Sequence, residues 1–141
     1  MDHKLKLMVV DDSPLFRTWL IRSLSADDRF QIVGYAVNAL DAQEKIPLLQ
    51  PDMLTLDIEM PGMSGIDFLK QLLPVHPIPV ILVSSLNLRV FDALEAGAVD
   101  FVRKPDEANG LSKEIFLSML RSKLMVAAAS HVHLPSAPAD P

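Results

Sequence analysis

The chain has 141 residues, half of them hydrophobic, and 13 basic against 18 acidic residues give it a net charge of −5. This length suits one ordinary domain with its own core, and the hydrophobic content argues against intrinsic disorder. The absence of cysteine excludes a disulfide framework, a thiol nucleophile and a cysteine-bound metal. The acidic balance disfavours binding to nucleic acid. Because no segment has the apolar length of a signal peptide or a membrane span, we expect a soluble, cytoplasmic domain with no membrane contact.

Short apolar runs alternate with segments of helical periodicity along the chain. The runs are too short for helices and apolar enough for strands that are buried on both faces; they are residues 5–10, 30–36, 53–56, 80–83 and 100–103. Ser13 and Pro14 mark the start of the first helix, since serine caps helices and proline suits the first helical position. Pro47 is expected to kink the second helix or to end it early.

The helical segments each present one apolar face. These faces are Phe16, Leu20 and Leu24; Ala39, Ala42, Ile46 and Leu49; Ile66, Leu69 and Leu73; residues 90–96, closed by Gly97; and Leu111, Ile115, Met119 and Leu124. Strict alternation of strands and helices predicts a doubly wound α/β fold with a five-stranded parallel sheet. We place this domain at residues 4–127 and interpret residues 128–141, which hold three prolines, as a Pro-rich linker or disordered tail.

Polar side chains stand where four of the predicted strands end. Asp11 and Asp12 follow the first strand, Asp57 the third, Ser84 the fourth and Lys104 the fifth. Ligands bind beyond the carboxyl ends of parallel strands, so we expect these groups to meet at one edge of the sheet. Three close carboxylates need a cation or a proton, and Mg²⁺ suits them. A carboxylate there could take up a phosphoryl group, with its charge neutralised by the ion, the Lys104 ammonium and the Ser84 hydroxyl.

Five motifs together resemble the receiver domain of two-component response regulators, over residues 4 to about 125. They are VVDDS at 9–13, LDIEMPGMSG at 56–65, VSS at 83–85, AGAVDF at 96–101 and KP at 104–105. Residues 55–61, 83–86 and 93–102 look most like the receiver of chemotaxis protein-glutamate methylesterases, where a linker and a hydrolase domain follow. The resemblance implies a flavodoxin-like fold with strand order 2-1-3-4-5.

The resemblance also implies a role for each residue at the strand ends. Asp57 would accept a phosphoryl group from the phosphohistidine of a histidine kinase. Asp11, Asp12, Asp57 and the backbone carbonyl of Ile58 would hold Mg²⁺ or Mn²⁺. Lys104 would pair with the phosphoryl group, and Ser84 would bond one of its oxygens and move with it.

Three further residues have expected roles near the site. Phe101 would be an aromatic switch that turns inward as Ser84 moves, although a plain core aromatic is the alternative. Pro105 would follow a constrained, often cis, peptide, as proline permits. Glu59, two residues after Asp57, is hypothesised to overhang the site and to tune the attack of water on the acyl phosphate.

The chain departs from the methylesterase pattern in two ways. Ser84 and Gly97 are 13 positions apart, which looks shorter than in the common receiver and puts the geometry of the signalling surface in question. No hydrolase motif of the form G-x-S-x-G is present, so the expected activity is confined to self-phosphorylation and autodephosphorylation. The chain could be a fragment of a methylesterase or a single-domain regulator.

Other functions remain open on the sequence alone. The main alternative is an interaction module of the same fold that works without phosphorylation. An aspartyl-phosphate phosphatase would need Asp-x-Asp, whereas the sequence has Asp57 followed two positions later by Glu59. A flavin-binding relative is disfavoured because acids after the first strand would repel the flavin phosphate. The expected partners are a histidine kinase and a hydrolase domain in a parent chain. A second copy of this chain, in a weak homodimer, is a further possible partner.

Overall fold

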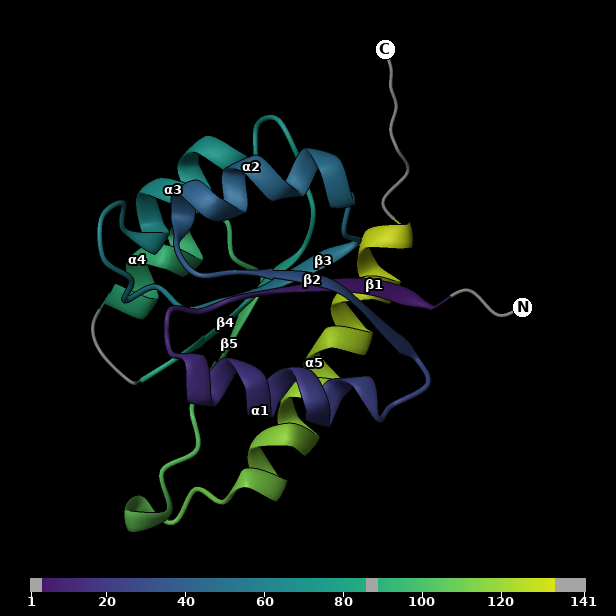
Figure 1. Ribbon diagram of the computed structural model, residues 1–141, viewed down its shortest axis with the longest axis vertical. Coiled ribbons are helices and arrows are strands. Elements are labelled where there is room, and N and C mark those ends of the chain that lie inside the picture. The colour runs from purple at the N-terminus through teal and green to yellow at the C-terminus, as the bar shows by residue number, and fades with distance from the viewer. Residues whose placement is uncertain (1–3, 86–88, 134–141) are drawn as a thin grey trace.

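The fold is built around a parallel sheet with helices on both faces (Figure 1). It is seen in a computed structural model that describes residues 4–85 and 89–133. The strands are β1 (Leu5–Val10), β2 (Phe30–Ala36), β3 (Met53–Leu56), β4 (Val80–Ser84) and β5 (Asp100–Arg103). They pair in the order β2-β1-β3-β4-β5, which confirms the predicted fold class and strand order.

Two layers of helices cover the sheet. Helices α1 (Pro14–Ser25) and α5 (Lys113–His133) lie on one face, and α2 (Ala39–Leu49), α3 (Gly65–Leu72) and α4 (Arg89–Glu95) lie on the other (Figure 1). A single 3-10 turn, η1 (Glu107–Asn109), precedes α5. Successive strand residues point to opposite faces, so Leu7 and Val9 pack with α1 and α5, while Met8 and Val10 pack with α2 and α3. Both faces are buried, and this accounts for the unbroken apolar runs.

Helix α1 begins as its sequence predicts. Ser13 is the N-cap residue, its hydroxyl accepts a hydrogen bond from the Phe16 N–H at 3.4 Å, and Pro14 takes the first helical position. Because β1 ends at Val10, this cap fixes a short connection that carries Asp11 and Asp12.

Helix α2 continues past its proline. Of the two effects expected of Pro47, a kink or an early end, the early end is wrong, since α2 runs to Leu49. Gln50 then takes the left-handed conformation, with φ 49°, and its N–H donates to the Ile46 carbonyl at 2.8 Å. A proline costs a helix one backbone hydrogen bond, and here that loss falls in the last turn.

The buried face of helix α5 agrees with the expected one only in part. Leu124 is buried as predicted, but Ile115 and Met119 are 50% and 42% exposed, and Phe116, Leu120 and Ala127 take their place in the core. Apolar residues occur all round this helix, so their periodicity did not single out the buried stripe. The helix also reaches His133, six residues beyond the expected boundary at 127, and residues 134–141 lie outside the described part of the chain.

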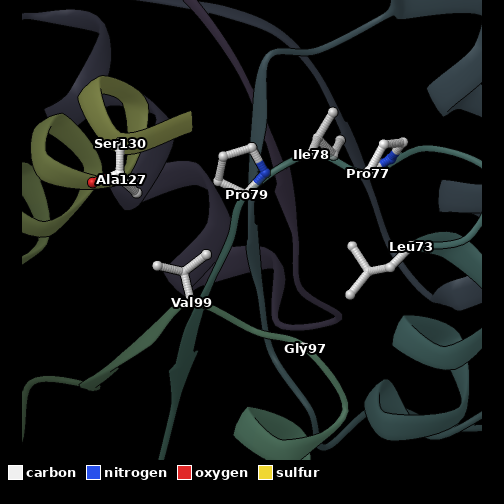
Figure 2. Close-up of a pocket in the computed structure, with 8 residues that line it drawn as sticks. All are labelled: Leu73, Pro77, Ile78, Pro79, Gly97, Val99, Ala127 and Ser130. Carbon is white, nitrogen blue, oxygen red and sulfur yellow. The ribbon is translucent and has the colours of Figure 1, made fainter. Parts of the chain in front are cut away.

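An apolar pocket of about 280 Å³ lies beyond the amino ends of β4 and β5 (Figure 2). Pro77, Pro79 and Val99 line it together with Ala127 near the end of α5. The polar strand-end residues lie at the opposite, carboxyl edge of the sheet, so the pocket takes no part in their chemistry. Among the described residues, no helix combines the length and the apolar character that a membrane crossing requires.

Candidate functional site

Three carboxylates meet at the carboxyl edge of the sheet. Val10 and Leu56 are register partners in β1 and β3, so the residues that follow them, Asp11 and Asp57, emerge side by side. Oxygen atoms of Asp11, Asp12 and Asp57 all lie within 4.8 Å of one another. Asp11 and Asp57 are only 2% and 5% exposed, whereas Asp12 is exposed. The predicted acidic cluster is therefore present, with one carboxylate open to solvent.

Both carboxylate oxygens of Asp57 accept hydrogen bonds. Its Oδ1 accepts from the Ser84 hydroxyl at 3.1 Å and from the Glu59 N–H at 2.9 Å. Its Oδ2 accepts from the Lys104 ammonium at 3.1 Å. The side chain is thus held in one orientation by donors from β4, from the loop after β3 and from the end of β5.

Lys104 joins two of the three carboxylates. Its Nζ also lies 3.0 Å from Asp11 Oδ2, and its backbone N–H donates to the Ser84 carbonyl at 2.9 Å. Burial opposes the charge on Lys104, but the neighbouring Asp11 and Asp57 carboxylates outweigh it, and the pKa of Lys104 lies above its usual value. Burial raises the pKa of Asp11, against the opposing effects of the Ser13 N–H and Lys104.

Arg17 was not among the sequence-predicted site residues, yet it holds the backbone of the acidic loop. Its guanidinium donates to the Asp11 carbonyl at 2.8 Å and stacks 4.6 Å from the centre of the Tyr35 ring. The Ser13 N–H fixes the Asp11 side chain as well, by donating to Oδ1 at 2.8 Å. No sequence pattern marked Arg17, because its contacts join α1 to the connections after β1 and to β2.

Phe16 is the second residue that sequence reasoning missed at the site. The pattern placed it on the apolar face of the first helix with Leu20 and Leu24, and those two are fully buried. Phe16 itself is half-buried, and the Lys104 Nζ lies over its ring, 4.5 Å from the centroid. Its position one helical turn after the acidic pair was the available signal.

The other predicted residues surround the cluster. Ile58 is buried and its carbonyl accepts from the Gly65 N–H at 3.3 Å, while Glu59 is exposed. Phe101 is half-buried and packs against the core under α2, α3 and α4. The peptide before Pro105, expected to be constrained and often cis, is trans, since no described peptide bond is cis; trans is the lower-energy form even before proline.

The donor set fits a hard divalent cation. Carboxylate oxygens are the ligands that Mg²⁺ accepts in proteins, usually with several waters retained, and the exposed side of Asp12 leaves room for them. Three carboxylates against one ammonium leave an excess of negative charge that a divalent ion would offset. A buried carboxylate beside an ammonium, a hydroxyl and a cation site is arranged to accept a phosphoryl group.

The fold and this edge cluster together define a class of protein: a flavodoxin-like domain with an acidic site at the carboxyl ends of its strands. Comparison with known protein families agrees with this class. The model of the response regulator receiver domain matches residues 7–116. The chain belongs to this family.

The chain is similar to part of several longer curated proteins and to a solved receiver domain. A protein-glutamate methylesterase/protein-glutamine glutaminase 2 from Syntrophomonas wolfei is 45% identical over 92% of this chain, and a protein-glutamate methylesterase/protein-glutamine glutaminase from Syntrophotalea carbinolica is 46% identical over 94%. The chain spans 38% of the length of each. The crystal structure of the response regulator domain of Thermotoga maritima CheB has a TM-score of 0.79 and 34% identity, and the match covers 99% of this chain and 100% of that one. These likenesses confirm the predicted receiver family and its similarity to methylesterase receivers.

Proposed function

We propose that this chain is a phosphorylatable receiver that takes a phosphoryl group onto Asp57 from the phosphohistidine of a histidine kinase. One observation carries the proposal: Asp57 is 5% exposed and contacts both the Lys104 ammonium and the Ser84 hydroxyl beside two further carboxylates. A merely structural aspartate would not need two extra acids at its side, since like charges so close repel.

The metal site belongs to the same proposal. Asp11, Asp12 and Asp57, with the Ile58 carbonyl, would hold Mg²⁺ or Mn²⁺. When bound, the ion supplies positive charge that offsets the negative charge of the incoming phosphoryl group. The proximity of the three carboxylates, within 4.8 Å of one another, supports this assignment.

The side chains of the protein perform the transfer. An Asp57 carboxylate oxygen attacks phosphorus, a new oxygen–phosphorus bond forms, and the phosphorus–nitrogen bond to histidine breaks, with its electron pair going to the imidazole. Lys104 exchanges its contact with Asp57 Oδ2, now 3.1 Å long, for one with a phosphoryl oxygen. The Ser84 hydroxyl does the same from Oδ1, also 3.1 Å away. Both groups start within reach of the developing charge.

Ser84 and Phe101 are proposed to pass the change to an output surface. Ser84 is fully buried at the end of β4, so its movement toward a phosphoryl oxygen would alter packing near half-buried Phe101 on the neighbouring β5. Glu59 is proposed to tune hydrolysis of the acyl phosphate. Equal lifetimes of the phosphorylated protein and of its Glu59→Ala variant would refute that role.

The chain is further proposed to be the regulatory part of a chemotaxis methylesterase-like protein, in which a hydrolase domain is the partner. Its 38% share of the length of two such relatives supports this. A cytoplasmic location follows, because histidine kinases draw on ATP there. Equal esterase activity of a parent protein with and without phosphodonor would contradict the regulatory role.

The test is intact-mass spectrometry after incubation with acetyl phosphate and Mg²⁺. The proposal predicts the gain of one phosphoryl group, which is lost in Asp57→Asn and in the presence of a chelator. Ser25→Ala, at the far end of α1, is a matched control that keeps the gain. No gain under any condition would favour the alternative, an interaction module that works without phosphorylation.

A further inference from the structure

We propose that Phe16 is a positioning residue for phosphoryl transfer, in which its ring holds the Lys104 ammonium at the reaction site. This inference rests on the proposed function. It starts from a contact between two elements that are distant in sequence: the Lys104 Nζ, after β5, lies 4.5 Å from the centroid of the Phe16 ring in α1.

The ammonium is enclosed by two kinds of surface. Asp11 Oδ2 and Asp57 Oδ2 accept from it at 3.0 and 3.1 Å, and the lysine side chain is 20% exposed. The face of the Phe16 ring covers another side. An aromatic face attracts a cation but accepts no strong hydrogen bond, so it restrains the ammonium without competing for its donors.

The Phe16 ring is itself fixed on two sides. Its centroid lies 5.7 Å from that of Trp19 in α1 and 5.9 Å from that of Phe116 in α5, the latter in an edge-on arrangement. Its backbone N–H is bound to the N-cap Ser13. The ring therefore lies on a rigid support contributed by both helices of this layer, and it can define where the ammonium lies.

This restraint matters most during transfer. Lys104 must give up Asp57 Oδ2 and engage a phosphoryl oxygen, so for a time the carboxylate no longer holds it. The ring contact persists through that exchange, because it does not involve the atoms that react. Without the ring, the ammonium would gain access to water and to rotamers that point away from the phosphoryl group.

The test compares Phe16→Leu, which keeps apolar bulk but removes the ring, with Phe16→Tyr, which restores a ring. Leu15→Ala is the matched control, because Leu15 is the neighbouring residue and is 87% exposed. Phosphorylation by acetyl phosphate is followed at limiting donor. We expect Phe16→Leu to slow phosphorylation about fivefold, which corresponds to the loss of a partly desolvated cation–π contact. Phe16→Tyr should restore the rate of the parent. The affinity of each variant for Mg²⁺ is measured by calorimetry, and the phosphorylation rates are compared at saturating Mg²⁺, so that a change in ion affinity does not enter the comparison.

A second readout does not depend on phosphorylation. Urea unfolding of the parent, Phe16→Leu, Lys104→Met and the double variant forms a double-mutant cycle. The proposal predicts a coupling of about fivefold in the unfolding equilibrium constant. Absence of coupling, or equal phosphorylation rates in the parent and in Phe16→Leu, would overturn the positioning role of Phe16 and leave the proposed function standing. Failure of the parent to take up phosphate would overturn the proposed function, and the positioning role with it, whatever the cycle shows.

Discussion

At the scale of single residues, the site sets three carboxylates against one ammonium. Lys104 contacts Asp11 and Asp57, both of which are almost fully buried, while Asp12 faces solvent. Burial raises the pKa of Asp11, because it disfavours the ionised form of this carboxyl group. The ion-free protein therefore depends on Lys104 to offset part of the repulsion at the edge of the sheet.

Replacement of Lys104 by methionine should destabilise the ion-free protein. Two buried carboxylates would lose their common partner, and we expect the free energy of unfolding to fall by about 2–3 kcal/mol, somewhat less than for a fully buried pair because water reaches the site. Urea unfolding in chelator measures the change. The double variant Lys104→Met, Asp57→Asn should recover part of it, and an unchanged unfolding midpoint for Lys104→Met would contradict this account.

A second ion pair, remote from the site, gives a pH prediction. Hydrogen bonding to Arg29 lowers the pKa of Asp27 from its usual 3.8 to about 2. Because the pKa is lower in the folded protein, the contribution to stability is present above about pH 4 and is lost as the pH falls toward 2. Asp27→Asn should therefore be less stable than the parent at neutral pH, by at most about 1 kcal/mol since Arg29 is exposed. Urea unfolding at several pH values tests this; a difference that persists undiminished at pH 2 would refute it.

At the scale of elements, the short connections after the strands determine where the site residues lie. The loop after β3 carries Asp57 and Ile58 and closes against the start of α3, where Gly65 donates to the Ile58 carbonyl at 3.3 Å. A Cβ at Gly65 would lie 2.6 Å from Ile58 Cα. Glycine at this position therefore permits the close approach of helix and loop that places the Ile58 carbonyl.

Gly65→Ala is expected to disturb this loop. The added methyl group meets backbone rather than a flexible side chain, so the loop or the helix must shift, at a cost of about 1–3 kcal/mol in the free energy of unfolding. Phosphorylation by acetyl phosphate should slow as well, because the shift reaches the residue next to Asp57. Ser64→Ala is the control for the helix start: it removes the N-cap bond to Asp67 without crowding Ile58. Parent-like stability of Gly65→Ala would contradict the close approach.

The elements differ in how well the sequence predicts them. Four of the five strands have the predicted bounds, and β4 is one residue longer, because their apolar runs end at charged or polar residues. The buried face of α5 could not be predicted in full, since Ile115 and Phe116 are adjacent apolar residues. Only the packing of the helix on the sheet determines that Phe116, and not Ile115, is buried. The strand-end acids, Ser84 and Lys104 were predictable from parallel topology. Phe16 and Arg17 were not, because their roles arise from contacts between elements.

At the scale of the whole molecule, the proposed ion site predicts that ion binding is coupled to stability. The carboxylates converge only in the folded chain, since β1 and β3 must pair to bring Asp11 beside Asp57. An ion that binds the folded state alone stabilises it according to its concentration.

Mg²⁺ at one hundred times its dissociation constant should therefore raise the free energy of unfolding by about 2.7 kcal/mol. Urea unfolding with and without the ion measures this. Asp12→Asn should reduce the effect while leaving the ion-free stability nearly unchanged, because Asp12 is exposed. An equal response to Mg²⁺ in Asp12→Asn would show that the ion binds elsewhere.

Asp57 is the residue proposed to receive the phosphoryl group. The most direct measurement is to phosphorylate the protein with acetyl phosphate and Mg²⁺, reduce the acyl phosphate with borohydride, and map the resulting homoserine by peptide mass spectrometry. We expect homoserine at position 57 and at neither Asp11 nor Asp12. Homoserine at another position, or none in a protein that has gained phosphate, would contradict it.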